Sequence, residues 1–219
     1  MIRRILPLGG ILAGLLALAP GAQAAQNFGG CSLDGNAKLN PGLGANQPTP
    51  DPGGPGIDWG PAFTYSFDGT LDNCVSVDGS GPAQASGGTI SAGEPLSING
   101  ISYLPANVPS GNGGCTGSHT DGISIVKWGD GTLSAVDYST DGVAAGIGLT
   151  GTFLDSITLT RKDPDANGQP VKDTFTNLKY AGDYTGGPLV FHPADPTQCN
   201  GAGVTTSPIT GFIGHGDYQ

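Results

Sequence analysis

One segment of the chain has the residue types and spacing of a cation site. Residues 163–168, Asp-Pro-Asp-Ala-Asn-Gly, place oxygen ligands at alternate positions and then a glycine. Calcium-binding loops begin in this way, because alternate hard oxygen ligands face one ion and glycine permits the sharp bend. The second half departs from that pattern, since Thr174 stands where a bidentate Glu would close the site. A solvated turn is the alternative to calcium, for which the candidate ligands are Asp163, Asp165, Asn167 and Asp173.

Exposed aromatic rings bind sugars by stacking on them, and Trp59 is the candidate for that role. It lies in a loop, residues 41–62, that is too rich in Pro and Gly for a helix or a central strand. The other tryptophan, Trp128, alternates with Val126 on one strand face, which favours core packing. A carbohydrate-binding module that uses Trp59 is therefore one alternative function, with cell wall or another polysaccharide as its ligand.

Residue types that hydrolyse bonds are present, but they do not form a recognised motif. The sequence has neither a Gly-x-Ser-x-Gly elbow nor a His-Glu-x-x-His pair. We interpret His119 as part of a polar loop beside Cys115, and His215 as a solvated residue of the chain end. An Asp-dependent glycoside hydrolase is a second alternative, because the separation of two carboxylates depends on the fold. We expect a non-enzymatic protein with no catalytic residue.

Four cysteines stand alone in the sequence, without a CxxC pair, at Cys31, Cys74, Cys115 and Cys199. An even number of cysteines in an exported chain predicts two disulfides rather than a zinc site. Three pairings are possible. We favour Cys31 with Cys74 and Cys115 with Cys199, because each bond would tie the ends of one half of the chain.

The first 24 residues have the three parts of a cleaved signal peptide. A basic start precedes an apolar stretch over residues 5–20 and a small-residue motif, Ala-Gln-Ala, at 22–24. Pro and Gly interrupt the apolar stretch, which is too short to span a bilayer. We therefore expect residues 25–219 to be secreted as one monomeric domain, extracellular or associated with the cell envelope, without membrane insertion after cleavage.

Composition narrows the class of protein further. The 219 residues include 18 Asp+Glu against 8 Lys+Arg, and the formal net charge is −10. Nucleic acid is excluded as a partner, because binding it requires a basic patch that so few cations do not build. The chain has 40 Gly and 18 Pro, and only 12% of its residues are charged. This composition is typical of a turn-rich, secreted β protein.

The elements that position these residues are predicted to be strands. Residues 63–72 alternate apolar and polar side chains, as a half-buried strand does. Residues 122–128 and 132–138 flank the turn Gly129-Asp130-Gly131 and form a predicted hairpin. Short strands without intervening helices favour a sandwich or a barrel. We predict an all-β, single-domain β-sandwich, immunoglobulin-like or jelly-roll-like, with about ten short antiparallel strands and little helix outside the signal peptide. The remaining strand candidates are residues 32–39, 88–91, 143–150, 153–160, 174–180, 188–191 and 204–212.

The order of several segments resembles a group of uncharacterised secreted proteins from actinobacteria. The four cysteines and the Trp-x-Asp-Gly hairpin are the more specific parts of this resemblance, which covers nearly all of residues 25–219. It implies a secreted all-β domain and brings no catalytic residues. We expect an interaction or structural module of the extracellular space or cell envelope. The segments are Cys31-Ser-Leu-Asp-Gly, Asn40-Pro-Gly-Leu, residues 63–74, Cys115, residues 125–131, Tyr180-Ala-Gly-Asp, residues 195–199 and Gly203-Val-Thr-Thr.

Overall fold

The computed structural model describes residues 26–45, 49–50, 56–77 and 87–217, and these residues are mostly β-strand. The signal peptide predicted over residues 1–24, and parts of the predicted loop at 41–62, lie outside the described residues. In the described part, one short 3₁₀-helix, η2 (Pro196–Asn200), precedes the last strand. An all-β chain with little helix is thus confirmed. The strands are β1 (Gln26–Leu43), β2 (Thr49–Pro50), β3 (Ile57–Asp58), β4 (Ala62–Ser76), β5 (Gly88–Ala92), β6 (Leu96–Ile98), β7 (Ile101–Tyr103), β8 (Ser110–Gly114), β9 (Gly117–Trp128), β10 (Leu133–Val143), β11 (Gly146–Phe153), β12 (Ser156–Thr160), β13 (Lys172–Thr176), β14 (Tyr184–Phe191) and β15 (Val204–Asp217).

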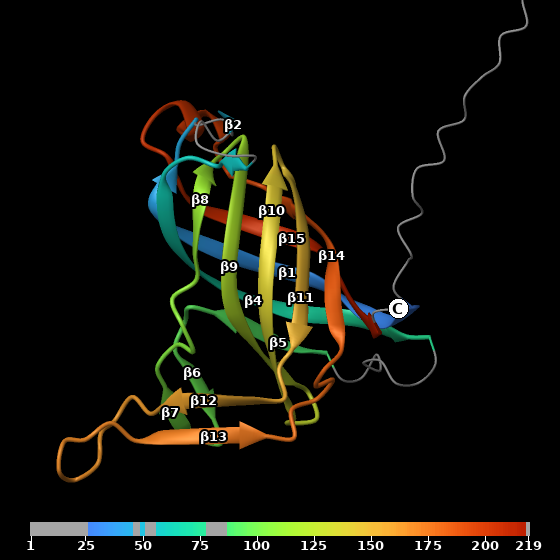
Figure 1. Cartoon of the computed structure of the whole chain (residues 1–219), viewed down its shortest axis with the longest axis vertical. Helices are drawn as coiled ribbons and strands as arrows, with labels where there is room; N and C mark the ends of the chain where they lie inside the picture. The colour runs from blue at the N-terminus through green and yellow to red at the C-terminus, as the bar shows by residue number, and fades with distance from the viewer. Residues whose placement is uncertain (1–25, 46–48, 51–55, 78–86, 218–219) are drawn as a thin grey trace, which may run out of the picture.

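The main sheet closes on itself as an antiparallel barrel of eight strands. The order around the barrel is β1, β15, β14, β11, β10, β9, β5 and β4, and β4 pairs again with β1. The short strand β8 pairs with the beginnings of β4 and β9 at one end. Figure 1 shows β9, β10 and β11 running steeply across the front, with β1, β4 and β15 crossing behind them.

The predicted β-sandwich is therefore wrong. A sandwich has two sheets with free edges, whereas β1 is hydrogen-bonded on both sides, to β15 over Gln26–Leu43 and to β4 over Gly29–Asn40. The strands are also longer than expected: β1 has 18 residues, β4 has 15 and β15 has 14. Alternation predicts one wet and one apolar face in both folds, so it does not distinguish a closed sheet from two stacked ones.

Paired glycines let the long strands β1 and β4 lie close together beside an aromatic ring. Gly35 of β1 and Gly69 of β4 lie opposite each other in the register. A Cβ at Gly35 would lie 2.5 Å from the Phe67 ring and 2.8 Å from the Cα of Gly69. A side chain at Gly35 would therefore collide with β4 and with the Phe67 ring, which is why glycine is needed where a neighbouring backbone approaches this closely.

The predicted hairpin is confirmed in β9 and β10, which pair from Leu133 with Lys127 to Val143 with Gly117. Trp128 is 4% exposed and lies among the barrel core residues, as its alternation with Val126 predicted. The strand candidate at residues 143–150 is confirmed only from Gly146 onward, where β11 begins, because Val143 ends β10 and pairs with Gly146 across the turn.

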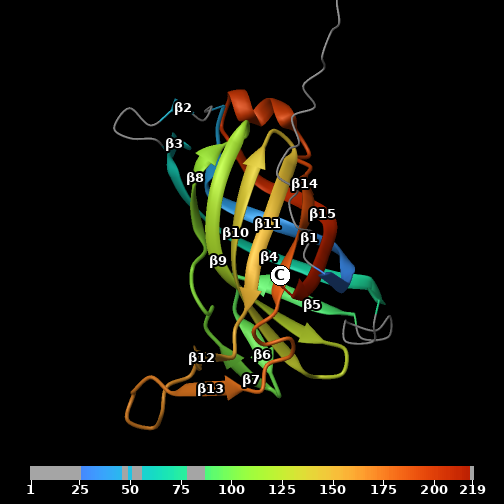
Figure 2. The ribbon, with the colours of Figure 1, turned by 45° about the vertical axis from the view of Figure 1, so that its right-hand side comes forward.

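A second, smaller core covers the outer face of β9 and β10. The hairpins β6–β7 and β12–β13 supply most of it, and Figures 1 and 2 show both at the same end of the barrel. Ile125 of β9 and Ala135 of β10 alternate with inward-facing residues and therefore point outward into this cluster. These two strands are buried on both faces. The buried members of the cluster are Ile98, Tyr103, Ile125, Ala135, Ile157, Leu159 and Leu178.

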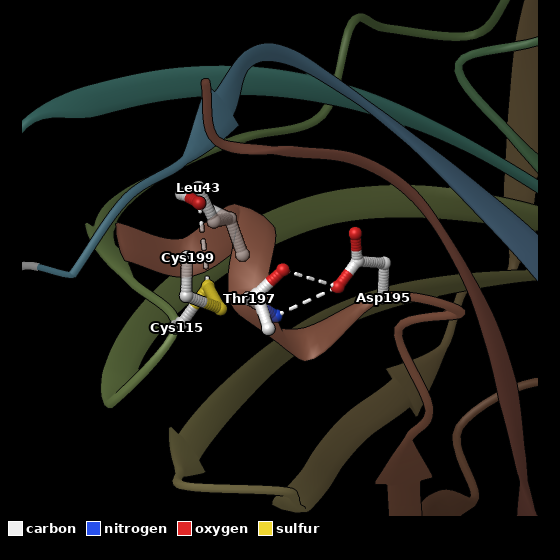
Figure 3. Close-up of a disulfide and its surroundings, with 5 residues drawn as sticks. All are labelled: Leu43, Cys115, Asp195, Thr197 and Cys199. Atoms are coloured by element: carbon white, nitrogen blue, oxygen red, sulfur yellow. Dashed lines mark hydrogen bonds between the residues drawn. A yellow bond between two sulfur atoms is a disulfide. The ribbon is translucent and has the colours of Figure 1, made fainter. Parts of the chain in front are cut away.

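The disulfide pairing favoured from the sequence is confirmed. Cys31 and Cys74 link the neighbouring strands β1 and β4, and both are almost fully buried. Cys115, in the β8–β9 turn, is bonded to Cys199 of η2. The Cys115 sulfur lies 3.3 Å from the carbonyl oxygen of Leu43 (Figure 3), and this is a contact rather than a hydrogen bond because a disulfide sulfur carries no proton. Two disulfides agree with an oxidising, extracellular compartment.

The same close-up shows how η2 begins. The backbone N–H and the hydroxyl of Thr197 both donate to Asp195 Oδ1, at 3.0 and 2.5 Å. The carboxylate thus satisfies an N–H group at the start of the helix, where no backbone acceptor is available. None of the helical segments within the described ranges is long and apolar enough to cross a lipid bilayer.

The turn of the β9–β10 hairpin holds an ionised carboxylate. Asp130 Oδ1 accepts from the hydroxyl of Thr132 at 2.6 Å and from its N–H at 2.9 Å, and Oδ2 accepts from Lys179 Nζ at 2.9 Å. These bonds, that of the Thr132 hydroxyl first, lower the pKa of Asp130 from 3.8 to about 2. The carboxylate therefore ties this turn to Lys179, in the connection between β13 and β14.

Asp130→Asn should make stability less sensitive to acid. A carboxyl whose pKa is lower in the folded state stabilises the fold above its unfolded pKa, and this contribution is lost as the pH falls through the folded value. Here the loss runs from about pH 4 to about pH 2, and it amounts to less than about 1 kcal/mol because the ion pair is exposed. Urea unfolding at about pH 5 and about pH 2.5 measures it. An unchanged pH dependence in the variant would show that Asp130 does not contribute.

Candidate ligand cavity inside the barrel

Side chains on the inner face of the barrel leave a cavity of about 140 Å³. Protein cores have few voids larger than a water molecule, so a space of this size is unusual for a packed interior. Every strand of the barrel contributes to its lining, which is almost wholly apolar. The lining includes Leu33, Leu39, Phe63, Tyr65, Phe67, Ile90, Ala92, Ser118, Thr120, Ser124, Val126, Trp128, Val136, Tyr138, Thr140, Leu149, Phe153, Tyr180, Thr185, Leu189, Phe191, Ile209 and His215.

Four aromatic rings pack together on one side of this cavity. Tyr180 is at the centre: its ring meets those of Trp128 and Phe153 edge-on at 5.5 Å and that of His215 at 4.3 Å between centroids. Tyr180 comes from the connection between β13 and β14 and has a φ of +64°. Edge-to-face pairs of this kind are favourable beyond the area that they bury. The connection thus contributes a ring to the barrel interior.

The polar atom of Trp128 is satisfied inside this aromatic group. Its Nε1 donates to Ser134 Oγ at 2.8 Å, and Ser134 Oγ donates to the carbonyl oxygen of Lys179 at 2.8 Å. A buried indole N–H without an acceptor would destabilise the fold. The two bonds join β9, β10 and the β13–β14 connection, and they fix the position of the tryptophan ring.

The interpretation of His215 as a solvated residue of the chain end is wrong. It lies in β15, its side chain is 4% exposed, and its Nε2 is 3.2 Å from Asp183 Oδ2. The strand continues because Gly214 and His215 pair with β1 on one side and β14 on the other. Proximity to the chain end predicts fraying, but a strand that closes a barrel is held on both edges.

Four hydroxyl groups form a row along the cavity wall. Tyr138 Oη lies 2.6 Å from Tyr65 Oη, which lies 3.1 Å from Thr120 Oγ1, and Thr120 Oγ1 lies 2.8 Å from Thr140 Oγ1. Burial raises the pKa of Tyr65 and of Tyr138, so both phenols stay protonated. Sequence reasoning missed this row, although Tyr65 and Tyr138 lie in the predicted strands 63–72 and 132–138, because Thr140 lies beyond the predicted end of the second strand.

The chemistry of the cavity lining suits neutral rather than charged molecules. Among the described residues, no Lys, Arg, Asp or Glu lines it. An ion placed there would lose its hydration without gaining a partner of opposite charge, which is very unfavourable. The hydroxyl row is the longest polar feature of this lining, which also includes Ser118, Ser124, Thr185 and His215.

The structure places Trp59 outside the barrel. Its ring stacks on His119 of β9, with centroids 6.0 Å apart and planes inclined by 25°. His119 Nδ1 is 2.7 Å from Asp141 Oδ1 on β10, so the histidine belongs to a strand rather than to the polar loop that we expected. Trp59 is thus half-buried against a histidine, and sugar stacking on its ring stays a prediction.

Two of the four predicted calcium ligands, Asp165 and Asp173, make separate hydrogen bonds with different parts of the chain. Asp165 Oδ1 accepts from the N–H groups of Asn167 and Gln169, both at 2.8 Å, which makes a turn. Asp173, on β13, accepts two bonds from the Arg161 guanidinium and one from the Tyr103 hydroxyl. These bonds lower the pKa of Asp173, that of Arg161 most. In the described ranges no cluster of three or more His, Cys, Asp or Glu residues could hold a metal ion, and calcium binding stays a prediction.

Two aspartates share a groove on the outer surface of the barrel. The groove, of about 630 Å³, crosses β1, β4, β5 and β9 and includes Asp34 and Asp68. In the register Asp34 is opposite Thr70, and Asp68 is opposite Asn36. The two carboxylates are therefore diagonal neighbours. Asp68 is 3.7 Å from the amine of Lys38. The hydrolase alternative stays a prediction.

Comparisons of this chain with protein-family models, with curated proteins and with solved structures gave no match. The resemblance to secreted actinobacterial proteins therefore rests on the sequence pattern alone. What the structure adds to it is that the four cysteines form two disulfides.

Proposed function

We propose that this protein is a secreted, non-enzymatic binding protein whose barrel encloses one small, largely apolar molecule. The observation that carries the proposal is the apolar cavity of about 140 Å³ inside the closed barrel. An empty cavity lowers stability by about 24 cal/mol per Å³, or about 3 kcal/mol for this one. A ligand that fills the space would recover much of this free energy, which gives it a reason to bind.

The size of the cavity indicates the size of the ligand. Eight strands make a barrel whose interior either is filled by side chains or holds one small ligand. A dry apolar cavity of roughly 150 Å³ accepts benzene or xenon. A single six-membered ring is therefore the scale of molecule that fits without rearrangement of the wall.

The proposal includes an extracellular location, either free or in the cell envelope. The two disulfides and the leader pattern of residues 1–24 support it. The sequence led us to expect an interaction or structural module. The proposal specifies its role as the carriage or capture of a small molecule. Membership of the actinobacterial group of secreted proteins belongs to the same proposal.

Benzene should bind to the purified protein and raise its melting temperature. A ligand that binds only the folded state stabilises it by RT ln(1 + [L]/Kd), so the rise should follow the benzene concentration. Amide chemical shifts in NMR spectra should change for residues that line the cavity, such as Ala92 and Val136. Ala92→Leu, which adds three carbons on the inner face of β5, should weaken binding at least tenfold.

Ala145→Leu is the matched control, because Ala145 lies exposed in the β10–β11 turn. It should bind benzene as the wild type does. The proposal fails if benzene changes neither the melting temperature nor the amide shifts of the wild type. It also fails if Ala92→Leu folds and still binds benzene with unchanged affinity, because the binding site would then lie elsewhere.

A further inference from the structure

The hydroxyl row inside the barrel has one more O–H donor than it has hydrogen bonds. Four hydroxyl groups, those of Tyr138, Tyr65, Thr120 and Thr140, carry four protons and are joined by three hydrogen bonds. Each bond uses one proton, so one O–H remains without an acceptor whichever way the donors run. Within the described residues the structure gives the row no further acceptor.

The surroundings of Tyr138 decide which end keeps the spare proton. A Cβ built on Gly122 would lie 2.8 Å from Tyr138 Oη and 2.8 Å from Pro109 Cβ, so this end of the row is enclosed. An O–H that pointed there would be buried without a partner, which is costly. The order in which neither Tyr138 nor the two inner hydroxyls keep an unpaired O–H is that Tyr138 donates to Tyr65, Tyr65 to Thr120 and Thr120 to Thr140.

In this order the spare proton lies on Thr140 Oγ1. Thr140 is less buried than Tyr138 and lines the cavity. We infer that the ligand is a neutral ring or short apolar molecule with one hydrogen-bond acceptor, such as a carbonyl or ether oxygen, which accepts from Thr140. The inference rests on the proposed function, because it names the ligand class of the same cavity.

A water molecule fits this position less well than such a ligand. Buried waters typically make about three hydrogen bonds, and apolar cavities without several polar partners stay dry. Ser118, Ser124, Thr185 and His215 also line the wall, but its exposed surface is almost wholly apolar, so a water at Thr140 would leave most of its own hydrogen bonds unmade. A ligand with an apolar body and one oxygen atom satisfies the hydroxyl and fills the remaining space.

The test compares two probes of nearly the same shape, cyclohexanone and methylenecyclohexane. They differ in a carbonyl oxygen against a CH₂ group, so only cyclohexanone accepts a hydrogen bond. Dissociation constants of both would be measured by NMR titration for the wild type and for Thr140→Val. The ratio of the cyclohexanone Kd to the methylenecyclohexane Kd should rise about tenfold in Thr140→Val, since a lost hydrogen bond weakens binding by up to that factor.

Thr150→Val is the matched control, because Thr150 lies on β11 and its hydroxyl pairs with Ser139 on the outer face. Its ratio should equal that of the wild type. If methylenecyclohexane binds and the ratio does not change in Thr140→Val, the inference is overturned while the proposed function stands. If neither probe binds the wild type, the proposed function itself fails. Melting curves of both variants establish that they fold.

Discussion

Replacing Trp128 by alanine should lower the free energy of unfolding by about 4 kcal/mol, within the range of 3–5 kcal/mol for large aromatic residues in cores. The indole is 4% exposed and packs edge-on against Tyr180. Its loss leaves Ser134 bonded to the Lys179 carbonyl, so the effect comes from lost packing rather than from a stranded polar group. Urea denaturation followed by circular dichroism measures the change.

Trp59→Ala provides the comparison for this prediction. Trp59 is the other tryptophan of the chain, and it is half-buried on the outside against His119. Its removal should lower the free energy of unfolding by less than about 1 kcal/mol, because little apolar area returns to water. Equal losses in the two variants would contradict the assignment of Trp128 to the core.

Removing the Cys115–Cys199 disulfide by alanine substitutions should lower the free energy of unfolding by about 4.5 kcal/mol in the chain-entropy model. The bond closes a loop with a sequence separation of 84, which restricts the unfolded chain strongly. The Cys31–Cys74 bond spans 43 residues and should give about 4 kcal/mol. The two loops do not overlap along the chain, so the two losses should add.

Unfolding in urea of each double alanine variant, and of the quadruple variant, measures these losses. Cys31 and Cys74 are the more deeply buried pair, so their removal also changes core packing. For this reason the Cys115–Cys199 variant is the cleaner measure of loop closure. A loss below about 1 kcal/mol there would show that the unfolded chain is already compact without the bond.

The sequence predicted features that depend on residues close together in the chain, namely a hairpin, a core tryptophan and the disulfide pairing. The turn Gly129-Asp130-Gly131 and the alternation around it were sufficient for the β9–β10 hairpin, because a tight turn sets the register of its own strands. The inward position of Trp128 followed from the same alternation. The disulfide pairing also followed from the chain, since both bonds link cysteines that are neighbours in sequence order.

Barrel closure depends on pairs that are far apart in the sequence. Cys31 of β1 is opposite Ile213 of β15, and Leu33 is opposite Leu71 of β4. No turn fixes these registers, because long connections separate the strands. A strand with one apolar face has the same alternating sequence in a sandwich and in a barrel, so alternation alone did not decide between the two folds.

The cavity could not be predicted for a related reason. Its volume is the difference between the space that the barrel wall encloses and the space that inward side chains fill. Small residues such as Ala92 and Ser124 were visible in the sequence, but which of them face inward, and which large rings they face, was not. The contribution of Tyr180 depends on a positive φ in the connection between β13 and β14, which is rare for a tyrosine.

Because β9 and β10 are buried on both faces, we expect this part of the barrel wall to be stiffer than the other strands. Residues next to each other in β9, such as Ile125 and Val126, belong to different cores. Separating β9 from β10 would expose both cores at once, so their amide protons should exchange with solvent only when the whole domain unfolds. If the interior takes up a small molecule as we propose, that molecule should not enter between β9 and β10, because opening this pair costs both cores.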